Sequence, residues 1–193
     1  MNKIGIYSGS FNPIHFGHIK LAKYLITSKL VDEVWLIVSP QNPLKKETDL
    51  ADDNLRLSMA KIAFGKQKKI SVLDVEFHLP KPSYTIDTLN FLQKKYPQNQ
   101  FFLLIGADNV AVFDKWKNYS EILEKFNVLC YPRENFPQKS DKFPQIQFIN
   151  APLVNISSTE IRNRLKNNLL CNLLCDNLLP KNVLKFIQKN HIY

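Results

Sequence analysis

The 193-residue sequence is poor in glycine and cysteine, with five glycines and three cysteines. So few glycines exclude a collagen-like or low-complexity chain, and an odd number of cysteines without framework spacing argues against a disulfide scaffold. We expect free thiols, a cytoplasmic location and no secretory signal. We also expect Cys171 and Cys175 to be small buried side chains rather than zinc ligands. The longest apolar runs, 34–38 and 101–105, are far shorter than the roughly 20 residues of a membrane span.

Long runs of like charge are also missing. The net charge of +9 favours anionic partners such as nucleic acid or phosphorylated small molecules. The basic residues, however, occur as scattered pairs, and no RNA-binding motif or zinc finger is recognisable. We therefore expect neither a nucleic-acid nor a membrane partner. A nucleic-acid module is kept as the alternative from another class, and tight, salt-sensitive binding would favour it.

Short apolar segments alternate with amphipathic segments of helical period. This alternation predicts a Rossmann-like, doubly wound α/β fold, with a mostly parallel sheet and helices on both faces. We expect one domain over 1–193, with the C-terminal helical segment 157–193 packed on it. Ligands bind such sheets at the carboxyl ends of the strands, so function is sought there. The expected strands are 4–7, 33–39, 70–75, 101–105, 128–131 and 146–149, and the expected helices 15–30, 53–64, 85–96, 121–126, 158–168 and 181–190.

The loop after the first expected strand has the strongest functional signal. Residues 9–18 read GSFNPIHFGH, in which Gly9 and Gly17 let backbone approach a ligand closely. A helix beginning near His15 would point its free N–H groups at the sheet edge, which is an anion site. His15 and His18 share a face of that turn and can donate hydrogen bonds to a polyphosphate. A zinc pair is less favoured, because no nearby residue offers a third ligand.

This loop resembles the HxGH signature of the nucleotidylyltransferase superfamily at His15, Gly17 and His18. The preceding residues resemble the opening of the bacterial nicotinate-nucleotide adenylyltransferases, usually Gly-Gly-Thr-Phe-Asp-Pro. The departures from that opening are Ser8, Ser10 and Asn12.

A second stretch, ISSTEIR at 156–162, has two interpretations. Ser157 followed by Glu160 predicts a helix capping box. The stretch also resembles the superfamily's second signature, ISSTxIR, at every position. Two signatures in order, about 140 residues apart, argue against coincidence. The resemblance implies that this helix start adds hydroxyls, N–H groups and the Arg162 guanidinium to a phosphate site.

Three further features concern the second substrate. Asp108, in the Gly106-Ala107-Asp108 stretch, follows an apolar strand, where a carboxylate holds ribose hydroxyls or simply makes a turn. Thr85, in PSYTIDTL at 82–89, is a candidate N-cap. Trp116 either packs in the core or stacks on a pyridine ring. The resemblance implies that N–H groups at Thr85 meet a nicotinate carboxylate, which favours the acid over the amide substrate.

The segment 42–46 aligns with the family's Pro-Pro-His-Lys. Lys45 matches the lysine, whereas Leu44 replaces the histidine. Arg56 also matches the family, but an exposed arginine on a helix is the plainer interpretation. The resulting hypothesis names catalytic residues, ATP-binding residues and mononucleotide-binding residues. The catalytic residues are His15, His18, Lys45 and Arg162. The ATP-binding residues are Gly9, Ser10, Phe11, Gly17, Ser157, Ser158 and Thr159. The mononucleotide-binding residues are Thr85, Gly106, Asp108 and Trp116.

The resemblance implies adenylyl transfer from ATP to nicotinate mononucleotide, giving deamido-NAD and pyrophosphate without a covalent enzyme intermediate. Mg²⁺ would be held mainly by ATP phosphates, with no metal site built from protein ligands. A cytidylyltransferase or phosphopantetheine adenylyltransferase would share the first signature, but the PSYT, G-x-D and Trp116 features argue against both. Nicotinamide mononucleotide stays open as the preferred substrate, and the sequence does not indicate the oligomeric state.

Overall fold

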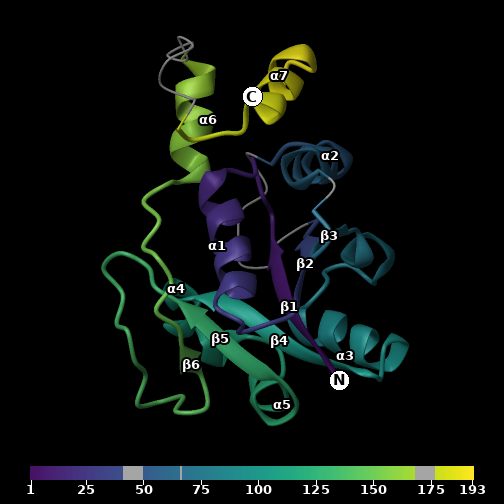
Figure 1. The fold of residues 1–193 in the computed structure, drawn as a ribbon, viewed down its shortest axis with the longest axis vertical. Helices are drawn as coiled ribbons and strands as arrows, with labels where there is room; N and C mark the ends of the chain where they lie inside the picture. Colours follow the sequence, from purple (N-terminus) through teal and green to yellow (C-terminus); the bar gives the residue numbers. More distant parts are fainter. Residues whose placement is uncertain (41–49, 66, 168–176) are drawn as a thin grey trace.

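A computed structural model describes residues 1–40, 50–65, 67–167 and 177–193. Its six strands form a parallel sheet in the order β3-β2-β1-β4-β5-β6, which confirms the predicted fold class (Figure 1). The strands are β1 (Asn2–Gly9), β2 (Glu33–Val38), β3 (Ile70–Leu73), β4 (Asn99–Gly106), β5 (Asn127–Tyr131) and β6 (Gln147–Phe148).

The order of the strands creates a crevice at the centre of the sheet. β1 lies in the middle, where Ile6 is in register with Trp35 of β2 and with Leu103 of β4. The chain builds outward from β1 to β3 on one side and then returns to the other side of β1 with β4. The connections after β1 and β4 therefore diverge, and ligands bind at such a switch point.

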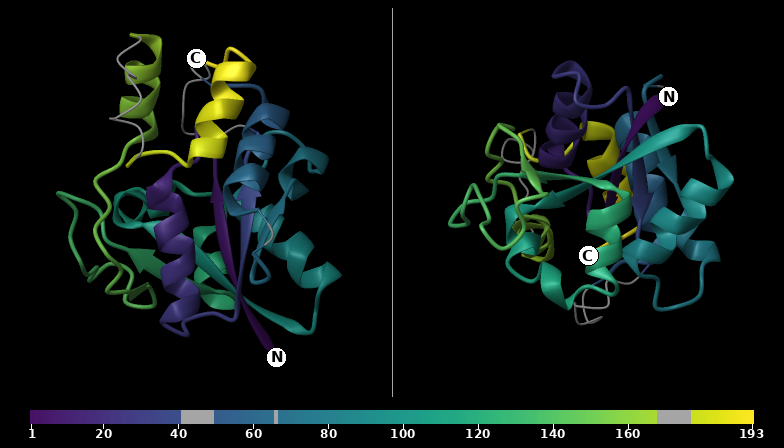
Figure 2. Two further views of the ribbon diagram at one scale, coloured as in Figure 1. Left: turned by 45° about the horizontal axis from the view of Figure 1, so that its top comes forward. Right: turned by 90° about the horizontal axis from the view of Figure 1, so that it is seen from below.

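Helices cover both faces of the sheet (Figures 1 and 2). One face packs against α1 (Phe16–Thr27), α2 (Asp53–Phe64) and α7 (Lys181–Lys189), and the other against α3 (Thr85–Lys95) and α5 (Tyr119–Lys125). Neighbouring strand residues alternate between the two cores: Leu36 belongs to the first and Ile37 to the second. Burial on both faces explains why the strands are almost continuously apolar.

The C-terminal elements contact the same core. Ile161 of α6 (Ser158–Lys166) and Val183 of α7 are buried in the cluster that includes α1 and α2. The Asn182 side chain donates to the Ile62 carbonyl at 2.9 Å, which fixes α7 beside α2 (Figure 2). None of the helices in the described part of the chain is long and apolar enough to cross a membrane.

The structure differs from the sequence predictions mainly at the ends of elements. β3 ends at Leu73, and a 3-10 turn, η1 (Val75–His78), follows it where the strand was expected to continue. A short helix α4 (Ala107–Val110) and a 3-10 turn η2 (Phe113–Lys115) occupy the segment after β4. The predicted last strand shortens to the two residues of β6, because the proline-rich segment before it follows an irregular path.

Candidate active site

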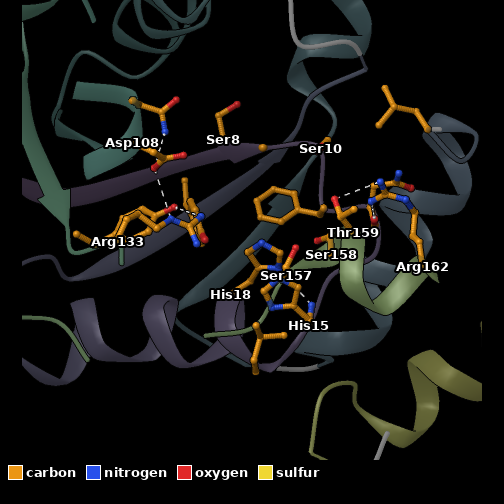
Figure 3. A pocket seen from close by; sticks show the side chains of 18 residues that line it. Ser8, Ser10, His15, His18, Asp108, Arg133, Ser157, Ser158, Thr159 and Arg162 are labelled. Carbon is orange, nitrogen blue, oxygen red and sulfur yellow. Dashed lines mark hydrogen bonds and ion pairs between the residues drawn. The ribbon is translucent and has the colours of Figure 1, made fainter. Parts of the chain in front are cut away.

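A cavity of about 460 Å³ opens at the carboxyl ends of β1, β4 and β5 (Figure 3). It is the place where the two sequence signatures meet. The first contributes the loop after β1 and the start of α1, and the second contributes the start of α6. The predicted residues that line this cavity are Gly9, Ser10, Phe11, His15, His18, Asp108, Ser157, Ser158, Thr159 and Arg162.

Two imidazoles cap α1 reciprocally. The Gly17 N–H donates to His15 Nδ1 at 3.1 Å, and the His15 N–H donates to His18 Nδ1 at 3.2 Å. The rings stack with centroids 3.6 Å apart. An Nδ1 that accepts a hydrogen bond carries no proton, so each ring bears its N–H at Nε2. Both histidines are thus fixed as neutral donors at the cavity.

Burial determines the charge of His15. Its side chain is 4% exposed, and loss of solvent lowers its pKa to about 3, with the nearby Arg133 guanidinium lowering it further. His15 is therefore uncharged at neutral pH, so it can offer a ligand a hydrogen bond but no net charge.

Gly17 lies beside this pair and does not line the 460 Å³ cavity in the part of the chain described. A Cβ atom there would be 2.5 Å from Val154 Cγ1 and 2.9 Å from His15 Cε1 and Nδ1. The glycine consequently allows the segment before α6 to pack against His15.

Direct hydrogen bonds join the two signatures. Ser158 Oγ donates to the Pro13 carbonyl at 3.1 Å, and Arg162 Nη1 donates to the Asn12 carbonyl at 2.9 Å. Arg162 Nε is buried, and none of the described groups accepts its proton. The guanidinium and the first turn of α6 together form an anion-binding corner of the cavity.

The predicted capping box at the start of α6 is wrong. Ser157 is the N-cap residue, but its side chain makes no capping hydrogen bond. Glu160 instead pairs with Arg164 one turn later. The Ser157 hydroxyl lines the cavity, so this helix start satisfies few of its own N–H groups with side chains.

The interpretation of Arg56 as an exposed arginine is wrong, because the residue is fully buried. It donates to the carbonyls of Ser10 and Ser39, both at 2.7 Å, and also to those of Pro40 and Ala51. Arg56 thus anchors the loop after β1 to the end of β2 and does not line the 460 Å³ cavity. Its function is to hold backbone in place.

The same loop is held from the far end of the chain. The Asn12 side-chain oxygen accepts hydrogen bonds from the Ala51 N–H, at 3.1 Å, and from the Tyr193 hydroxyl. The loop that bears the first signature is therefore bonded through both its backbone and its side chains.

A smaller cavity of about 110 Å³ adjoins the first, beneath the ends of β1 and β4. Two of the four residues predicted for the mononucleotide, Gly106 and Trp116, line it, whereas Thr85 and Asp108 do not. The Trp116 ring also packs on Phe113, with centroids 5.2 Å apart, and its buried Nε1 has no acceptor among the described groups. Trp116 therefore packs on the core and lines the cavity at the same time, and stacking on a pyridine ring stays a prediction.

The predicted N-cap at Thr85 is wrong by one residue. Tyr84 is the N-cap of α3, without a side-chain cap, and Thr85 is the first helical residue. Ser83, rather than Thr85, lines the smaller cavity. The absence of a side-chain cap on this helix start matters, because it leaves backbone N–H groups for a ligand.

The comparisons with known proteins agree with this geometry. The family model described as "Cytidylyltransferase-like" matches residues 6–164. A Flavobacterium johnsoniae protein named "Probable nicotinate-nucleotide adenylyltransferase" is 44% identical over 99% of this chain and 98% of its own length. The chain belongs to the nicotinate-nucleotide adenylyltransferase family. A Bacteroides thetaiotaomicron protein of the same name is 46% identical over 84% of this chain and 81% of its own.

Solved structures show the same fold for this family member. The Plasmodium falciparum nicotinic acid mononucleotide adenylyltransferase complexed with NaAD aligns with a TM-score of 0.81 over 100% of this chain and 98% of its own. The two sequences are 23% identical. The recognition made from the two signatures is therefore confirmed, and the protein is a nucleotidyltransferase.

Sequence reasoning missed a second guanidinium in this adenylyltransferase. Arg133 follows β5 and lines the larger cavity opposite Arg162 (Figure 3). Its Nε lies 3.5 Å from Asp108 Oδ1, and its Nη2 donates to the Tyr131 hydroxyl at 3.0 Å. The rule that ligands bind at strand ends would have found it, had the loop after β5 been searched like the others.

Lys45 and Leu44 lie outside the described residues, as do Cys171 and Cys175. The third cysteine, Cys130, is a buried free thiol in β5, and burial raises its pKa to about 12.

Proposed function

We propose that this protein transfers the adenylyl group of ATP to nicotinate mononucleotide, forming deamido-NAD and pyrophosphate. The mononucleotide phosphate attacks the α-phosphorus of ATP, a new P–O bond forms, and the bond to the bridging oxygen of pyrophosphate breaks. Family membership supports this reaction. The observation that carries the proposal is the meeting of a histidine pair with the start of α6 in one cavity at the switch point.

The two histidines act as donors to the phosphates of ATP. Each presents Nε2–H, because its Nδ1 is engaged by backbone. Phosphoryl chemistry of this kind needs positioning and charge stabilisation rather than an enzyme nucleophile. We assign His18 to the reacting α-phosphate and His15 to a neighbouring phosphate.

The cationic groups stand on either side of the histidines. Arg162 and the first turn of α6 neutralise charge that develops on the departing pyrophosphate. Arg133 faces them from the other side of the cavity (Figure 3), where it neutralises the attacking mononucleotide phosphate. Lys45 keeps its proposed phosphate role from the sequence match alone.

The smaller cavity is the proposed seat of the nicotinate ring. Trp116 supplies an aromatic wall. Asp108, on the short helix after Gly106, lines the larger cavity next to it, and we assign it to the ribose hydroxyls. The start of α3, which no side chain caps, supplies N–H groups and a positive dipole. A carboxylate gains more there than an amide, so we assign the acid as the preferred substrate.

Mg²⁺ is proposed to arrive with ATP. Within the described residues no three His, Cys, Asp or Glu side chains form a metal-binding group. The side-chain oxygens among the described residues that line the cavity belong to hydroxyl groups, two asparagines and one carboxylate, that of Asp108, which is paired with Arg133. This donor set fits a magnesium ion held mainly by phosphates and water, which would screen the phosphate charge when bound.

We further propose that residues 1–193 act as one cytoplasmic domain.

The test is pyrophosphate release from ATP with each pyridine mononucleotide in turn. We expect release with nicotinate mononucleotide, and a kcat/KM for the amide at least tenfold lower, the loss of one charge-assisted hydrogen bond. Equal values for acid and amide would refute the carboxylate assignment. No release with either would refute the function.

A further inference from the structure

Glu76 is a buried acid that the reaction scheme does not use. It lies on η1, its side chain is part of the wall of the smaller cavity, and the residue is 3% exposed. Its carboxylate accepts hydrogen bonds from Ser8 Oγ at 2.8 Å, Ser83 Oγ at 3.2 Å and Thr88 Oγ1 at 3.2 Å. These donors come from the end of β1, the loop before α3 and the first turns of α3. One carboxylate thus joins three segments that are distant in sequence.

The cost of burying the Glu76 carboxylate indicates that this residue does more than fill space. A buried carboxylate is costly unless its charge is compensated. In the described part of the chain no lysine, arginine or histidine forms an ion pair with Glu76. Compensation comes from the three hydroxyl groups that donate to the carboxylate. Hydrogen bonds to an ionised acceptor are roughly twice as strong as neutral ones, so Glu76 holds each donor firmly.

Ser8 determines which hydroxyl group donates in each hydrogen bond at the end of β1. The single hydroxyl proton of Ser8 is donated to Glu76, so the 3.0 Å contact between the Ser8 and Ser39 hydroxyls uses the Ser39 proton. Ser39 ends the backbone segment that Arg56 anchors. Ser8 thus connects the Glu76 carboxylate to the end of β2.

We propose that Glu76 is a positioning residue for the mononucleotide cavity. It fixes the hydroxyl-bearing walls at Ser8 and Ser83, and it fixes the start of α3 relative to the end of β1. The proposal rests on the proposed function, because it assumes that the pyridine nucleotide occupies the smaller cavity. Glu76 does not act on the ATP phosphates, which in the proposed function contact the histidine pair and Arg162 in the larger cavity.

The test is Glu76→Gln, which keeps the shape of the side chain and removes its charge. We expect the KM for nicotinate mononucleotide to rise about tenfold, the loss of roughly one charge-assisted hydrogen bond. The KM for ATP and kcat should stay within about twofold. An unchanged mononucleotide KM would overturn the proposal, and so would an equal rise in both KM values, which indicates general structural damage.

Two controls sharpen the result. Asp74→Asn makes the same charge change two residues away, on an exposed side chain that pairs with His78, and should leave both KM values unchanged. Ser83→Ala should raise the mononucleotide KM in the wild-type background but add little in Glu76→Gln, because both changes act on one bond. Full additivity would overturn the proposed link. Failure of the wild-type protein to release pyrophosphate would instead refute the proposed function before any variant is compared.

Discussion

Replacing Gly17 with alanine introduces a methyl group between the two signature segments. The new Cβ would lie 2.5 Å from Val154 Cγ1 and 2.9 Å from the His15 ring, whereas ordinary contact begins at 3.4 Å. Val154 would have to retreat by about 0.9 Å and the ring by about 0.5 Å. The ring has little freedom to move, because it is bonded to the Gly17 N–H and stacked on His18.

The effects on stability and on activity should differ. Alanine gains up to about 1 kcal/mol over glycine in a helix, while overpacking costs about 1–3 kcal/mol. The free energy of unfolding should therefore fall by about 3 kcal/mol at most. Displacing the histidine pair by half an ångström should lower kcat/KM at least tenfold, since a misplacement of about 1 Å can cost a factor of 10². Urea denaturation and pyrophosphate release measure the two quantities.

The double variant Gly17→Ala/Val154→Ala separates the two contacts. Truncating Val154 removes the closer clash and should recover stability, but the contact with the His15 ring remains. Activity should stay low. Wild-type kcat/KM in the single variant, or complete recovery of activity in the double variant, would refute the reasoning that the ring position matters.

Three further outcomes are expected. His18→Ala should lower kcat by about 10²–10³, whereas the unfolding free energy should fall by only about 1 kcal/mol, because one capping hydrogen bond of α1 is lost. A kcat within threefold of wild type would contradict its role, and His78→Ala, on a side chain 74% exposed, is the control. His15 is neutral when folded, with a pKa of about 3, but gains a proton below about pH 6.5 when unfolded. Its contribution to stability should be complete above pH 6.5 and should decline by up to about 1.4 kcal/mol per pH unit down to pH 3. Urea denaturation at each pH measures this decline. If His15→Asn shows the same decline as the wild type, protonation of His15 is not its cause. Arg56→Lys should lower the unfolding free energy by about 2–3 kcal/mol, because an ammonium cannot reproduce the guanidinium fork; a urea-measured loss below about 0.5 kcal/mol would show that the buried contacts matter little.

The sheet and the meeting of the two signatures could be predicted because both follow local rules. Apolar strands alternating with amphipathic helices specify a parallel sheet, and parallel strands bring their carboxyl ends together. This rule, together with the helix start near His15 and the HxGH signature, predicts His15 and His18 at the strand-end cavity, where they lie. The local hydrogen bonds that fix their tautomers depend on backbone geometry, which the sequence pattern does not encode.

The buried charged residues could not be predicted in this way. Arg56 and Glu76 were expected at the surface or were not singled out, because buried charges are rare without partners. Apart from the carboxylate of Asp53 beside Arg56, their partners include carbonyls and hydroxyls from distant segments. Thr85 was assigned as an N-cap from its intrinsic preference, which the local backbone path overrides by one residue.

The contact between Tyr193 and Asn12 has a practical consequence for handling the protein. The Tyr193 hydroxyl bonds to the loop that lines the larger cavity, so a purification tag fused after this residue would begin next to that cavity. Met1, which is 89% exposed, stands at the amino end of β1 on the opposite side of the molecule (Figure 1). An affinity handle or a surface-immobilisation linker placed before Met1 keeps the opening of the larger cavity clear.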